Sequence, residues 1–142
     1  MMNFSSQGKR ILLIDHQSYW RELSRKALQS VGFYVHTLAT YNQRPLQEWI
    51  KDEKLDLIVL GCARIGDEER RLIELVLDHK QHLLVLPASL PWRIMRALFL
   101  LGVDDIVDKT YNPEDLVQLV DEVLASTAPR NGYQAVERAS AE

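Results

Sequence analysis

Four residues of this sequence could carry chemistry, and each follows a short apolar run. Asp15 and His16 come directly after RILLI, Cys62 follows LDLIVLG, and Lys109 follows DDIV after one residue. A carboxylate beside an imidazole can hold a metal ion, a thiol can act as a nucleophile, and an ammonium can pair with a carboxylate or a phosphate. The elements that position these side chains decide between such roles.

The apolar runs alternate with longer segments of helical periodicity. This alternation predicts successive βαβ units around a parallel sheet. Runs that are apolar on both faces are typical of strands covered by helices on both sides. The five expected strands are residues 10–14, 34–38, 55–60, 82–86 and 104–107.

Five helices are expected between and after these strands, each with a recognisable start or end. Gly32 is suited to a left-handed cap at the end of the first. Asn42 with Pro45, Asp67, Ser89 with Pro91, and Asn112 with Pro113 mark the starts of the other four, and Gly102 marks the end of the fourth. We expect the first helix to pack through Trp20, Leu23, Ala27 and Val31, and the fifth through Leu116, Leu119, Val120 and Val123.

In an open parallel sheet, ligands collect at the carboxyl ends of the strands. This rule selects one set of positions: Asp15, His16, Gly61, Cys62, Pro87 to Ser89, and Lys109. No glycine-rich phosphate loop follows any expected strand, so a nucleotide would lack its usual backbone cradle.

Composition excludes several classes of protein. The chain has 142 residues, 46% of them hydrophobic, and its 17 basic and 20 acidic side chains give a net charge of −3, which predicts neither nucleic acid nor a membrane surface as a partner. One cysteine cannot form an internal disulfide. We expect a soluble cytoplasmic protein with a flexible segment 1–8, one domain over 9–126 and a mobile tail 127–142.

Four segments, ILLIDH, LDLIVLG, LLVLPAS and GVDDIVDKTYNPEDL, resemble the response-regulator receiver domain (CheY-like) in order and separation. The resemblance covers about residues 9–126 and is strongest over 102–116. It implies a flavodoxin-like, doubly wound sheet of five parallel strands in the order 2-1-3-4-5, with helices on both faces.

The resemblance also implies a site, from which this sequence departs. The family holds magnesium with two acidic residues, accepts a phosphoryl group on an aspartate, and adds a Ser or Thr and a lysine. The matching positions here are Asp15, His16, Gly61, Pro87 and Lys109. An imidazole suits magnesium poorly, and glycine cannot attack a phosphoryl group. We therefore expect a pseudo-receiver that binds proteins in a two-component-type pathway and is neither an enzyme nor dependent on a cofactor.

Other interpretations of these residues stay open at this point. Asp15 and Lys109 are most simply an ion pair, which would contribute at most about 1 kcal/mol if partly exposed. His16 and Asp15 are too few ligands for a metal site. A small enzyme could use Cys62, although free cysteine is usually a buried core residue. A conventional receiver could use another acceptor.

The fourth helix carries more apolar residues than packing requires. We expect it to pack on the sheet through one stripe, consisting of Ile94, Ala97, Leu98 and Leu101. A second apolar stripe remains, consisting of Trp92, Met95 and Phe99, and it either folds over the helix edge or forms part of a partner surface. The expected partner-binding residues are Trp92, Met95, Phe99, Ile106 and Val117. The resemblance implies that this face, built from the fourth helix, fifth strand and fifth helix, serves partners or a homodimer, with Ile106 replacing the aromatic residue usual in the family.

Overall fold

The sheet and its helices follow the alternation in the sequence. The computed structural model describes residues 8–52, 54–89, 91–107, 109 and 112–126. The expected terminal segments 1–8 and 127–142 lie outside these residues, apart from Gly8. The strands are β1 (Arg10–Ile14), β2 (Tyr34–Leu38), β3 (Leu57–Cys62), β4 (Leu83–Pro87) and β5 (Asp105–Ile106), and the helices are α1 (Ser18–Ser30), α2 (Gln43–Asp52), α3 (Asp67–Asp78), α4 (Trp92–Leu101) and α5 (Pro113–Ser126).

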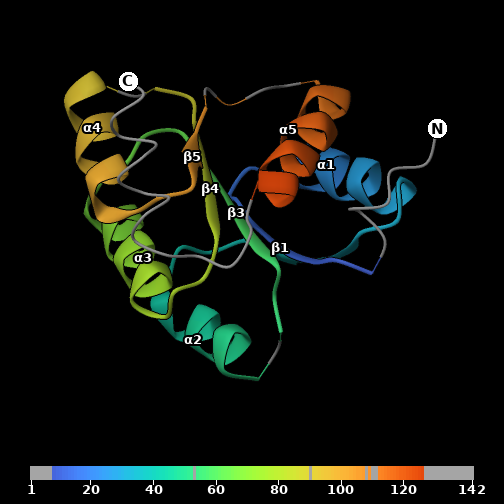
Figure 1. Ribbon diagram of the computed structural model, residues 1–142, viewed down its shortest axis with the longest axis horizontal. Helices are drawn as coiled ribbons and strands as arrows, with labels where there is room; N and C mark the ends of the chain where they lie inside the picture. Colours follow the sequence, from blue (N-terminus) through green and yellow to red (C-terminus); the bar gives the residue numbers. More distant parts are fainter. Residues whose placement is uncertain (1–7, 53, 90, 108, 110–111, 127–142) are drawn as a thin grey trace.

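All five strands pair in parallel in the order β2-β1-β3-β4-β5, which confirms the predicted fold class. Helices α2, α3 and α4 cover one face of the sheet, and α1 and α5 cover the other (Figure 1). Every residue of β3 and β4 is buried, as expected for strands that have helices on both sides. The sheet thus separates two apolar clusters, one on each face.

Local sequence signals place most helix ends correctly. Gly32 and Gly102 both adopt positive φ angles, of 106° and 104°, where only glycine avoids a steric cost. The Asn42 side chain accepts a hydrogen bond from the backbone N–H of Arg44, which caps α2. Asn112 caps α5 in the same way, so the predicted starts of these two helices are confirmed.

The predicted packing face of α1 is wrong in part. Its buried residues are Trp20, Ser24 and Leu28, whereas Leu23 and Ala27 are half-buried and Val31 is exposed. Ser24 is small enough to lie against the sheet, so the inward stripe is rotated by about one residue from the purely apolar one. In α5 the predicted stripe is confirmed for Leu116, Val120 and Val123.

The expected faces of α4 need a larger correction. The helix begins at Trp92 rather than Ser89, with Pro91 at its N-cap. Of the predicted inward stripe, Ala97 and Leu101 are exposed. Met95 and Phe99, which were expected on the second stripe, pack against the core instead.

Candidate functional site

A cleft of about 370 Å³ opens at the carboxyl ends of the strands, where ligands are expected in such a sheet. Its lining includes Asp15, His16, Tyr41, Arg64, Glu69 and Lys109. Asp15, His16 and Lys109 therefore meet as predicted. Gly61, Cys62 and Pro87 are buried at the ends of β3 and β4 and do not line the cleft.

Asp15 and Lys109 form a buried ion pair, which confirms the simplest interpretation of these two residues. The Lys109 Nζ lies 2.8 Å from Asp15 Oδ2, and the two side chains are 3% and 2% exposed. Asp15 Oδ2 accepts no aligned hydrogen bond, so the charge of Lys109 is what compensates its burial. The expectation of a weak, partly exposed pair does not apply here.

Further contacts fix both members of the pair. Asp15 Oδ1 accepts a hydrogen bond of 2.8 Å from the backbone N–H of Gln17. Lys109 Nζ donates to Gln17 Oε1 at 2.9 Å and lies 4.8 Å from the centre of the Trp20 ring. Both carboxylate oxygens and the ammonium are thus engaged within the protein.

His16 is held by an aromatic neighbour. Its ring stacks on that of Tyr41, with 4.0 Å between centroids and 22° between planes. The Tyr41 hydroxyl donates a 2.7 Å hydrogen bond to the Gly61 carbonyl, and it accepts a longer one, of 3.4 Å, from the backbone N–H of His16. Burial raises the pKa of the Tyr41 phenol, and the Asp15 carboxylate acts in the same direction.

These residues do not fit a magnesium ion. The Asp15 carboxylate is already paired, and His16 offers an imidazole where a hard oxygen ligand is needed. Within the described part of the chain, no three His, Cys, Asp or Glu side chains gather in a way that could hold a metal.

Cys62 is a buried core residue. It is completely inaccessible, and burial raises the pKa of its thiol to about 12, with the carboxylates of Glu69 and Asp15 adding to the effect. The thiolate is the reactive form of cysteine, so a pKa this high opposes the alternative of an enzyme that uses Cys62.

Several residues of the site were missed by sequence reasoning. Gln17 and Trp20 contact Lys109, Tyr41 contacts His16, and Arg64 and Glu69 line the cleft. Trp20 was expected only as a core residue. The position of Gln17 directly after Asp15 and His16 was a signal that it could belong to the site. Its residue type gave no such signal, because glutamine is common in ordinary loops.

The expected partner-binding residues do not share one surface. Trp92 is 63% exposed, whereas Met95, Phe99 and Val117 are half-buried. Ile106 is only 6% exposed and belongs to the core, so its placement on a surface was wrong. The β-branched side chain of Ile106 lies on the α4 side of the sheet, where it fills space among core residues.

No family model matches the chain. The phosphate regulon transcriptional regulatory protein PhoB of Pseudomonas aeruginosa is 29% identical over 136 residues, which are 92% of this chain and 58% of that protein. The chain thus spans a little over half the length of this curated relative.

Solved structures of response regulators share the fold. A response regulator from Thermotoga maritima has a TM-score of 0.71 at 20% identity, over 83% of this chain and 98% of that one. A CheY-like receiver domain protein from Methanospirillum hungatei gives 0.71 at 22% identity, over 82% and 94% of the two chains. An orphan response regulator of H. pylori gives 0.71 at 19% identity, over 82% and 97%. The chain therefore has the fold of a CheY-like response-regulator receiver domain.

Proposed function

We propose that this chain is a receiver-like module of a two-component-type pathway that acts by binding proteins and works without phosphorylation. The receiver fold and the similarity to PhoB support the signalling role. The residues at the carboxyl ends of the strands support the independence from phosphorylation. Neither catalysis nor a cofactor is part of the proposal.

One observation carries the proposal: the position at the end of β3 is glycine, and no room for a side chain exists there. A Cβ atom on Gly61 would overlap Asp15 Oδ2 and would lie 2.9 Å from Trp20 Cζ3. The position that accepts the phosphoryl group in receivers therefore has neither a nucleophile nor the space for one.

The other parts of a receiver site are changed as well. Pro87 provides no hydroxyl at the end of β4, and His16 replaces the second acidic residue. Phosphoryl transfer depends on positioned groups that neutralise charge. Asp15 is paired to Lys109, and Glu69, the other acidic residue of the cleft, accepts a hydrogen bond from the backbone N–H of Gly66, so both carboxylates already have partners within the protein.

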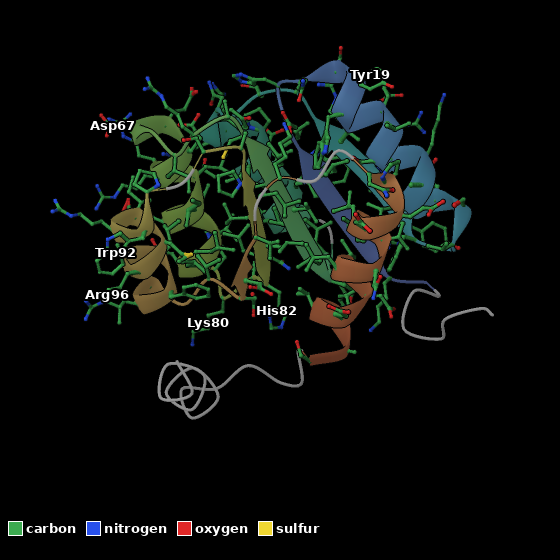
Figure 2. The ribbon with its side chains drawn as sticks, turned by 90° about the horizontal axis from the view of Figure 1, so that it is seen from above. Tyr19, Asp67, Lys80, His82, Trp92 and Arg96 are labelled. Atoms are coloured by element: carbon green, nitrogen blue, oxygen red, sulfur yellow. The ribbon has the colours of Figure 1, made fainter. Side chains whose placement is uncertain are left out.

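Other acceptors lie in the wrong places. Asp56 precedes β3, and its carboxylate accepts a hydrogen bond from the backbone N–H of Arg10 at the opposite end of the sheet. Asp67 begins α3 and points away from the sheet (Figure 2). Neither residue lines the cleft, so a conventional receiver with a different aspartate gains no support.

The test is incubation with acetyl phosphate and magnesium, followed by intact-protein mass spectrometry. We expect no mass increase for the wild-type chain, and none for Gly61→Asp, because the added carboxylate lacks space and a second acidic ligand. A stoichiometric increase of one phosphoryl group that is lost in Asp15→Asn would overturn the proposal.

We also propose where the protein partner binds. The outward face of α4, hereafter the α4 face, consists of Trp92, Arg93, Arg96, Ala97, Leu100 and Leu101, all exposed. Figure 2 shows Trp92 and Arg96 pointing away from the sheet. The face is apolar and basic, and α4 contains no acidic residue. It therefore suits an apolar partner surface with negative charge.

A second copy of the chain offers such a surface. Helix α5 carries Glu114, Asp115, Asp121 and Glu122 and no basic residue. A homodimer through α4, β5 and α5 would place the basic residues of α4 near the acidic residues of the other copy's α5. Nucleic acid is not proposed as a direct partner of this domain, because the net charge of the chain is −3.

A further inference from the structure

Four residues from separate parts of the chain meet beside the cleft, at the carboxyl ends of the strands. Asp15 follows β1, Trp20 belongs to α1, Gly61 lies in β3, and Lys109 follows β5. Trp20 is 2% exposed, and Asp15 is 1% exposed. We call these four residues the strand-end cluster.

Trp20 makes two contacts that no smaller residue could make together. The face of its indole lies under the Lys109 ammonium, 4.8 Å from Nζ to the ring centre. The edge of the same ring, at Cζ3, would lie 2.9 Å from a Cβ on Gly61. One side chain thus both supports the cation and occupies the volume beside the glycine.

The contacts of Lys109 explain why this support matters. An ammonium has three donors and is strongly hydrated in water, so its burial requires replacement partners. Gln17 Oε1 accepts one of these donors, the Asp15 carboxylate supplies the opposite charge at 2.8 Å, and the face of the indole supplies a cation–π contact. Without the indole, the ammonium would regain access to water and could move away from Asp15.

We propose that Trp20 is a positioning residue that holds Lys109 against Asp15, so that the Asp15 carboxylate and the indole edge together leave no room for a side chain at position 61. The loss of the acceptor is then fixed by packing, because a side chain at position 61 would require both Asp15 and Trp20 to shift. This inference rests on the proposed function, since it explains how the acceptor position stays without a side chain.

A double-mutant cycle tests the packing half of the inference. Gly61→Ala adds one methyl group to a filled site, so we expect the unfolding equilibrium constant to rise at least about tenfold. In a Trp20→Leu background the same change should have an effect of about threefold or less, because Lys109 and Asp15 can then shift away from the new methyl group. An equal effect of Gly61→Ala in both backgrounds would overturn the inference.

Side-chain NMR of Lys109 tests the positioning half. Protons of the Lys109 Cε next to an indole face are shifted upfield by the ring current, so we expect this shift in the wild-type chain and a smaller one in Trp20→Phe. Trp20→Leu removes the ring current together with the ring, so the readout for this variant is the exchange of the Lys109 ammonium protons with water. We expect faster exchange than in the wild-type chain, because the ammonium moves away from Asp15, whereas a purely space-filling role of Trp20 would leave the exchange unchanged. Unshifted Lys109 signals in the wild-type chain, or equal exchange in the three proteins, would overturn the inference.

Trp20→Phe also covers the case in which Trp20→Leu does not fold. It keeps an aromatic face under Lys109 but removes the Cζ3 edge beside Gly61. The cost of Gly61→Ala should therefore fall in this background while the upfield shift of Lys109 is partly kept; a full cost together with a lost shift would contradict both roles. These outcomes are separate from the proposed function: phosphoryl labelling of the wild-type chain would overturn that function, and an additive cycle would overturn only the role of Trp20.

Discussion

Lys109 brings a positive charge to a place that water barely reaches, and the chain compensates it with Asp15. Taking two charges out of water is costly, so a buried pair adds little net stability compared with an apolar pair. Removing one partner is different, because the remaining charge is then buried without compensation. The mutational consequences at the scale of single residues follow from this asymmetry.

We predict that Lys109→Met destabilises the native state by about 3–5 kcal/mol at neutral pH, because Asp15 is left buried and unpaired. Chemical denaturation measures this change. The control is the double variant Asp15→Asn with Lys109→Met, which removes both charges and should lose less stability than Lys109→Met alone. A cost below about 1 kcal/mol for the single variant would mean that the pair behaves like an exposed one.

Cys62 gives a prediction that depends on pH. The pKa of its thiol is about 12 in the native protein, against 9.0 for an unperturbed thiol. Above about pH 9 the unfolded chain loses this proton first, so the native state becomes less stable as the pH rises toward about 12, and below pH 9 the group has no effect. Stability measured across this range should decline less steeply in Cys62→Ala.

The same burial predicts slow chemistry at the thiol. A thiol-specific disulfide reagent at pH 8 should label Cys62 in the native protein many-fold more slowly than in denaturant, because both access and thiolate are lacking. Rapid labelling of the native protein would contradict this prediction and support the alternative of an enzyme that uses Cys62.

At the scale of elements, α4 shows that helical periodicity alone cannot predict which face of an apolar helix is packed. All of its residues except Arg93 and Arg96 are apolar, so more than one stripe satisfies the spacing of a packed face. The arginines resolve the choice, because their charged ends remain in water. Ala97 and Leu100 lie one helical turn from Arg93 and Arg96, on the same side of the helix, and they are therefore exposed as well. The positions of the two arginines were available in the sequence as a signal for the outward face.

Gly102 ends α4 in the left-handed conformation, with φ at 104°. We predict that Gly102→Ala destabilises the protein by about 1 kcal/mol, since an L residue with a Cβ is strained there. Gly102→Asn should cost less, because asparagine tolerates this conformation better. Thermal or chemical unfolding compares the two variants, and equal stability of Gly102→Ala and the wild-type chain would contradict the assignment.

At the scale of the whole molecule, the α4 face combines large exposed apolar side chains with arginines. Leu100 is 75% exposed and Trp92 is 63% exposed, and both lie beside arginines. Exposed apolar residues that gather on one helix face mark interaction sites more often than scattered ones do. No helix among the described residues is long and apolar enough to cross a membrane.

We predict that Trp92→Ser combined with Leu100→Glu reduces self-association and partner capture. The two substitutions remove exposed apolar area, and the new glutamate repels the negative charge expected on the partner. Sedimentation velocity and pull-down measure the two effects. Tyr19→Ser is the matched control, since Tyr19 is 75% exposed on α1 and lies on the other layer of helices (Figure 2). If the double variant folds and keeps both its association state and its partners, the α4 face is not the binding surface.

The fold was largely predictable because its signals are local. Apolar runs place the strands to within about two residues, and Gly32, Gly102, Asn42 and Asn112 mark helix ends through their own backbone or side-chain chemistry. Part of the candidate site was predictable for a similar reason. Parallel strands bring their carboxyl ends to one edge, so Asp15, His16 and Lys109 had to be neighbours.

The amino-acid sequence alone predicts the parallel sheet, the edge at which its strand ends meet, and the lack of a nucleophile at Gly61. The folded chain is needed to see that Asp15 and Lys109 are buried, that Trp20 contacts the ammonium, and that a Cβ on Gly61 would overlap Asp15. Such contacts join residues up to about ninety positions apart through close packing. Close packing depends on the volume of every neighbour at once, and periodicity along one element carries no information about that volume.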